Sequence, residues 1–165
     1  MRRFATTLLT LGLFGLEVLG ARAELLNSKP SEVCDSLRDE GLSTDGWKNK
    51  SGEQFGCSSP LKFLGSGGAV LQNNLTFFAE GTSNVVTLVR LLLIVNDRGT
   101  ASLAHRELLH SISKLSVKVT GGELSQELKD AVKTGVNTSQ RIRSSAVRIA
   151  RRPSERGYAV TVIIE

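Results

Sequence analysis

The chain has 165 residues, of which 40% are apolar, 22% charged and 5% aromatic, and its formal net charge is +5. This length suits one domain with a hydrophobic core and is too short for two domains of ordinary size. Three prolines and the lack of a Gly-X-Y period argue against a disordered or a collagenous chain. Two cysteines are too few for a scaffold built on disulfides.

The N-terminus predicts a secretory signal peptide. Arginines at positions 2 and 3 precede an apolar run over residues 4–16, and Ala-Arg-Ala at 21–23 places small residues at positions −3 and −1 of a cleavage site. The run is shorter than the roughly 20 residues that cross a bilayer. We therefore expect residues 1–23 to be removed and residues 24–165 to form a single exported domain, periplasmic or secreted, without a transmembrane segment.

Cys34 and Cys57 are the only cysteines, and in an oxidising compartment we expect them to form one disulfide. A metal site would need further ligands, and a redox pair would normally have C-x-x-C spacing. The bridge would tie a short helix, predicted over residues 30–40 and stopped by Gly41, to the segment that follows the polar loop 43–56. Closing this loop is worth about 3.5 kcal/mol in the chain-entropy model.

Apolar alternation predicts four strands, at residues 75–80, 85–95, 146–151 and 158–165, which pair as two antiparallel hairpins. The second strand is apolar on both faces, so we place it in the centre of the sheet. Residues 141–152 also fit a helical stripe; we favour the strand because the polar loop 153–157 suits a connection between antiparallel strands.

A long helix is predicted after Thr100, which can act as its N-cap. Its apolar stripe is Ala101, Ala104, Leu108, Ile112 and Leu115. Gly121 and Gly122 break this helix, and a shorter one is predicted over residues 123–133, closed by Gly135. The element order predicts an α+β fold: an antiparallel sheet of about four strands with two to three helices packed on one face.

No motif predicts a catalytic, cofactor-binding or metal-binding residue. His105 and His110 are five positions apart, so on one helix they point ~140° away from each other, unlike the two ligands of H-E-x-x-H. A G-x-S-x-G sequence is not present. A site assembled from distant residues is the alternative, because catalytic triads are recognised by geometry rather than by order in the sequence.

Two features are candidate partner-binding sites. Trp47 is the only tryptophan, and it either contacts a partner or covers one end of the core. The other feature is a run of arginines opposed only by Glu155: Arg141, Arg143, Arg148, Arg151, Arg152 and Arg156. Arginine suits carboxylates and phosphates, so the run predicts an acidic protein or an anionic envelope surface as partner. The alternative is a solvated hairpin face that resists aggregation.

Nucleic acid is not an expected partner, because the mature chain is only mildly basic and aromatic residues do not interleave the arginines. The hypothesis is a small exported binding or accessory protein that docks on an envelope or secreted partner, through the basic C-terminal hairpin or an exposed sheet edge. The alternative hypothesis is a small secreted hydrolase with a site assembled across loops. Catalysis is the less favoured of the two.

Overall fold

The computed structural model describes residues 23–65 and 71–165, so the predicted signal peptide lies outside it except for Ala23. Within these ranges, eight strands form one antiparallel sheet that is accompanied by three α-helices. The helices are α1 (Pro30–Cys34), α2 (Ala101–Thr120) and α3 (Gln126–Thr134), with the short 3₁₀ helices η1 (Arg38–Glu40) and η2 (Arg98–Thr100). The strands are β1 (Lys48–Ser51), β2 (Gln54–Ser58), β3 (Lys62–Leu64), β4 (Asn73–Gly81), β5 (Val86–Val95), β6 (Thr138–Ile142), β7 (Ser145–Pro153) and β8 (Tyr158–Ile164).

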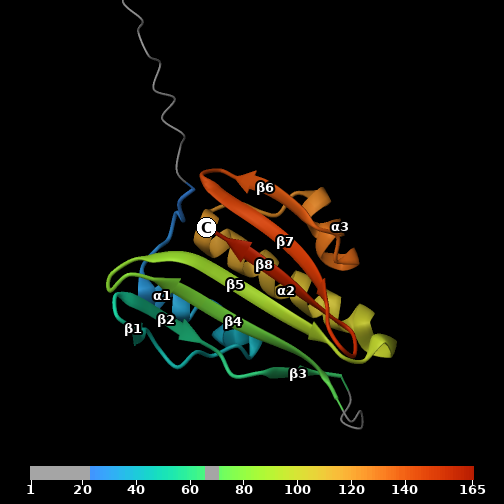
Figure 1. Ribbon diagram of the computed structural model, residues 1–165. Coiled ribbons are helices and arrows are strands. Elements are labelled where there is room, and N and C mark those ends of the chain that lie inside the picture. The colour runs from blue at the N-terminus through green and yellow to red at the C-terminus, as the bar shows by residue number, and fades with distance from the viewer. Residues whose placement is uncertain (1–22, 66–70) are drawn as a thin grey trace, which may run out of the picture.

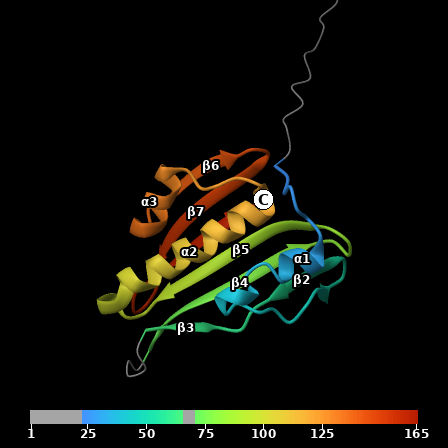
Figure 2. The same cartoon turned by 180° about the vertical axis from the view of Figure 1, so that it is seen from behind.

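The α+β class and the antiparallel sheet are confirmed, and the helices lie together on one face of that sheet. The strand order is β1-β2-β4-β5-β8-β7-β6, and β3 pairs with the part of β4 that β2 does not reach. Figure 1 shows the sheet from the side on which no helix lies in the described ranges, and Figure 2 shows α1, α2 and α3 in front of it. The sheet therefore has one covered face and one open face.

The predicted number of strands, about four, is wrong, because the described part of the chain contains eight. The predicted strands are β4, β5, β8 and β7, which are neighbours in the sheet and pair as the two expected hairpins. Residues 145–153 form β7, so the strand interpretation of this segment is confirmed and the helical one is wrong. The strands that were not predicted, β1, β2, β3 and β6, are short and lack a clear apolar alternation.

Helix α2 covers the sheet with the predicted apolar stripe. The stripe residues Ala104, Leu108, Ile112 and Leu115 are all 0% exposed. Thr100 does not cap α2 with its side chain. Instead its hydroxyl donates to the carboxylate of Asp97, which also accepts from the Gly99 N–H, both at 2.8 Å. Asp97 therefore organises the entry to the helix, and Gly121 ends α2 in the left-handed conformation, with φ 67°.

A disulfide between Cys34 and Cys57 joins α1 to β2, as predicted, with an S–S distance of 2.09 Å. Both cysteines are buried. The predicted helix over residues 30–40 is divided into α1 and η1, and Gly41 ends η1 with φ 70°. Because a helix as short as α1 is marginal in water, the covalent link to the sheet holds it in place.

The residues that follow the predicted cleavage site are fixed to the rest of the fold. The Glu24 carbonyl accepts from the hydroxyls of Ser144 and Ser145, at 3.0 and 2.7 Å. The Leu26 N–H donates to the Val119 carbonyl at 2.8 Å. We call residues 24–27 the N-terminal strap; it connects the β6–β7 turn to the end of α2.

Candidate functional site: the open face of the sheet

Strand β5 is apolar on both faces, but only one of them is core. Residues that point toward the helices are 0% exposed: Val89, Leu91, Leu93 and Val95. Residues that point the other way are half-buried: Leu88, Arg90, Leu92 and Ile94. The alternation follows from the two-residue period of a strand. Leucine and isoleucine thus stand on the face of the sheet that none of the described helices covers.

The strand register brings these residues into one patch, which threonines and arginines interrupt. Leu92 lies between Thr76 of β4 and Thr161 of β8, and Thr161 lies beside Ala150 of β7. We call the half-buried apolar side chains of this face the apolar centre: Phe78, Leu88, Leu92, Ile94, Ala146, Ala150, Ala159 and Ile163. An antiparallel sheet with one solvated face usually carries polar residues there. A contiguous exposed apolar patch marks an interaction site more often than isolated apolar residues do.

Arginines lie within and beside the apolar centre, and some are paired with carboxylates. The Arg90 guanidinium lies 4.6 Å from the ring centre of Phe78 and donates to Glu80 at 3.0 Å. On β7, Arg148 is 2.6 Å from the carboxylate of Glu165. Arg152 points to the same face and is exposed, and no carboxylate in the described ranges lies within ion-pair distance of it. The β7 side of the open face is therefore basic.

The six arginines of the predicted basic run do not form one surface. Arg141 pairs with Ala146 on the open face, and its guanidinium donates to the Ser144 carbonyl at 2.9 Å. Arg151 lies on the other face, with its guanidinium 3.6 Å from the ring centre of Tyr158. Arg143 stands in the β6–β7 turn with a positive φ of 54°. The open face thus receives Arg141, Arg148 and Arg152, whereas Arg156 lies in the loop between β7 and β8.

A hollow of about 660 Å³ lies on the open face, at the end opposite the arginines of β7. Phe78, Leu88 and the backbone of Gly56 contribute to its lining. Gly56 is needed there, because a Cβ at this position would be 2.7 Å from the Ala79 carbonyl oxygen. The stem of Lys50 passes beside Gly56 and forms part of the wall. The hollow is large enough for one or more side chains of a partner.

Trp47 is partly buried and packs against the core, and its indole N–H donates to the Ser83 carbonyl at 3.1 Å. It lies at the edge of a separate shallow pocket beside α1 and is not part of the hollow. The indole is thus held in place by the fold, with one part still accessible to solvent.

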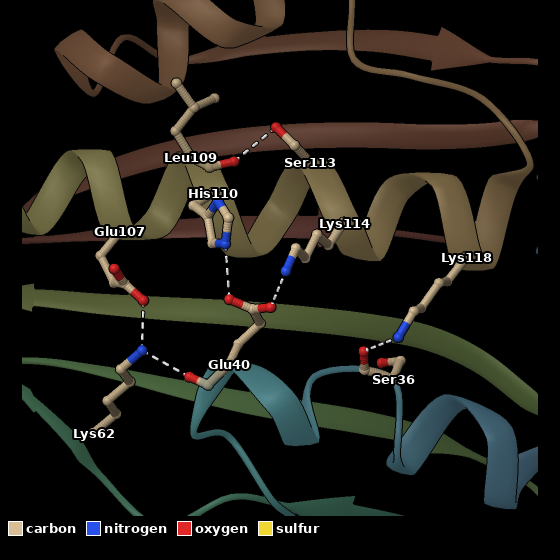
Figure 3. Close-up of polar contacts among 9 residues, drawn as sticks. All are labelled: Ser36, Glu40, Lys62, Glu107, Leu109, His110, Ser113, Lys114 and Lys118. Atoms are coloured by element: carbon tan, nitrogen blue, oxygen red, sulfur yellow. Dashed lines mark hydrogen bonds and ion pairs between the residues drawn. The ribbon is translucent and has the colours of Figure 1, made fainter.

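A second polar cluster lies on the helix side, between η1, β3 and α2 (Figure 3). The Glu40 carboxylate is bonded to His110 at 2.8 Å and also to Lys114, and its side chain is only 10% exposed. The hydrogen bond from Lys114 is the main cause that lowers the pKa of Glu40 below its ordinary value. Lys62 donates to the Glu40 carbonyl and to Glu107, at 2.6 and 2.5 Å. These contacts fasten η1 and β3 to α2.

The hydrogen-bond partners of the two histidines bear on the alternative hypothesis, a hydrolase. His105 is buried, with Nδ1 2.6 Å from the Val132 carbonyl and Nε2 2.9 Å from the Tyr158 hydroxyl. Because a carbonyl can only accept, Nδ1 carries the proton and Nε2 accepts from Tyr158. Ser113, one turn after His110, donates to the Leu109 carbonyl at 2.7 Å and points away from the imidazole (Figure 3). Neither histidine is bonded to a serine within the described ranges.

The fold and the open face define a small α+β protein whose antiparallel sheet is covered on one side only. Residues 22–156 match a family of unknown function, DUF6030, and the chain belongs to this family. No curated protein and no solved structure matches the chain.

Two further findings concern the described residues alone. No helix in residues 23–65 and 71–165 is long and apolar enough to span a bilayer. The same residues contain no group of three or more His, Cys, Asp or Glu side chains placed to hold a metal ion.

Proposed function

We propose that the protein is an exported binding or accessory protein that docks a partner protein on the open face of its sheet. The observation that carries the proposal is the apolar centre, half-buried on a face without helices in the described part of the chain. Covering such a patch would gain hydrophobic free energy of about 25 cal/mol per Å² of apolar area. A partner surface is the natural source of that cover.

A partner protein fits the open face better than an anionic membrane. Glu80 and Glu165 stand on the same face as the arginines and are bonded to Arg90 and Arg148. An anionic membrane would repel both carboxylates, whereas a protein can place charges of either sign opposite them. The fixed ion pairs therefore favour a partner with its own pattern of charges.

Export is supported by the signal pattern of the N-terminus and by the disulfide, which is typical of oxidising compartments. The family match, which begins at residue 22, leaves most of the proposed signal peptide outside the family region. Intact-mass measurement of the exported protein should give Glu24 as the first residue. Recovery of the full-length chain in the cytoplasm would contradict export.

Docking can be tested by site-specific crosslinking in the cells that produce the protein. A photoreactive residue is placed at Leu92, in the apolar centre, and in a matched control at Leu103, an exposed residue of α2 on the opposite side. We expect a discrete crosslinked protein from position 92 only, and its loss when Thr161→Glu is added beside the probe. Equal crosslinking from both positions, or a product that survives Thr161→Glu, would refute docking on the open face.

A further inference from the structure

The open face has two chemically different ends. At one end, the hollow has Phe78 and Leu88 in its wall, together with the charged Lys50, Glu53 and Glu80. The neighbouring Arg90 is neutralised by Glu80. At the other end, β7 presents Arg148, which is neutralised by Glu165, and Arg152, which has no ion-pair partner in the described ranges. A ligand that satisfies both ends must be apolar at one point and acidic at another.

The strand register gives the separation of the two ends. Phe78, Arg90, Ile163 and Arg148 are successive partners across β4, β5, β8 and β7. With strands about 4.8 Å apart, Phe78 and Arg148 are ~14 Å apart across the sheet. Arg152 lies four residues further along β7, so its distance from Phe78 is ~20 Å.

Charge also limits what can occupy the face. Two copies of the chain packed face to face would bring their surplus arginines into one interface, and like charges there oppose association. A segment that crosses the strands and ends in a carboxylate avoids this repulsion.

We propose that the open face recognises an acidic segment of a partner protein. A large apolar side chain of this segment occupies the hollow, and a carboxylate of the segment binds Arg152. The ~20 Å between Phe78 and Arg152 corresponds to about six residues of extended chain between the apolar and the acidic positions. This inference rests on the proposed docking function and adds to it the chemistry of the partner.

The test selects binders from a random dodecapeptide library displayed on phage, with the disulfide-bonded protein as bait. We expect enriched peptides to carry Leu, Met or an aromatic residue, followed or preceded at this spacing by Asp or Glu. A synthetic peptide of the enriched sequence is then titrated by fluorescence anisotropy. Its binding should weaken as salt is added, because exposed charges are screened over ~8–10 Å.

Matched variants separate the two ends of the face. Arg152→Glu should weaken binding of the synthetic peptide by about tenfold or more, whereas Arg156→Glu, with the same charge change in the neighbouring loop, should change it less than about twofold. Ser58→Trp, which places a ring in the hollow beside Phe78, should weaken binding as much, and Ser43→Trp in an exposed loop should not. Circular dichroism and thermal melting show whether each variant is folded.

The outcomes distinguish this inference from the proposed function. A library that yields no acidic peptide, while position 92 still crosslinks a partner, overturns the acidic chemistry and leaves docking intact. If the protein binds phosphatidylglycerol–phosphatidylcholine vesicles and Arg152→Glu abolishes this binding, the acidic partner segment is overturned in favour of a membrane. If sedimentation shows a dimer and Leu92→Glu dissociates it, the acidic partner segment is overturned in favour of a second copy of the chain.

Discussion

Two neighbouring leucines of β5 test which face of the sheet is core. Leu91 is 0% exposed and pairs with Phe77 and Val162 on the helix-covered face. Leu92 is half-buried in the apolar centre. Leu91→Ala removes buried methyl groups and leaves a cavity, so it should lower the free energy of unfolding by about 3–4 kcal/mol. Leu92→Ala removes groups already in contact with water, so its cost should be about 1 kcal/mol or less.

The assay is urea unfolding of the disulfide-bonded mature chain, followed by Trp47 fluorescence, because the chain has a single tryptophan. The difference between the two variants, about 2–3 kcal/mol, exceeds the usual error of linear extrapolation. Equal losses from the two substitutions would show that the open face is covered in the free protein. The reasoning behind the docking surface would then fail, whatever partner is found.

Three other predictions concern the scaffold. Cys34→Ala with Cys57→Ala should lower the free energy of unfolding by about 2–4 kcal/mol, measured by urea unfolding; two titratable thiols in the unreduced, unfolded chain would contradict the bridge. Because the folded pKa of Glu40 is lowered, its ionised form stabilises the fold above the ordinary value of 4.5, and this stability is lost as pH falls through the folded pKa. Glu40→Gln should therefore cost about 1 kcal/mol at neutral pH, and thermal melts should show the difference from the native chain shrinking in acid; a constant difference would refute this. Gly121→Ala should lower the melting temperature, since φ is 67° and the new Cβ would be 2.6 Å from Leu26; an unchanged melting temperature would show that the strap yields freely.

The sequence predicts the central strands and misses the outer ones for a physical reason. A central strand such as β5 must be apolar to be buried, and its pattern is therefore visible in the sequence. An outer strand such as β1, Lys-Asn-Lys-Ser, is exposed throughout and is held mainly by backbone hydrogen bonds to β2. Polar residues at an edge also prevent pairing with other chains, so selection against aggregation hides such strands from pattern analysis.

The candidate site was only partly predictable. The basic run is apparent in the sequence, but its division between two faces depends on the alternation of side chains along β7. Arg148 and Arg152 lie on the open face and Arg151 lies on the other. The apolar character of both faces of β5 was also visible, and it indicated a central position. The element order predicted helices on one face of the sheet, but which side chains of β5 point toward them follows only from the packing of α2.

The position of the last strand has a consequence for how the chain reaches its fold. Strand β8 lies between β5 and β7, so it joins the half of the sheet built from β1–β5 to the half built from β6 and β7. Until residues 158–164 arrive, β5 has an unpaired edge flanked by two apolar faces, which is a hazard for aggregation. Pairing of Leu91 with Val162 also closes a long loop, which slows folding. A chain that emerges in sequence order therefore completes this sheet only when residues 158–164 emerge, and deletion of β8 should leave two separate halves rather than a smaller sheet.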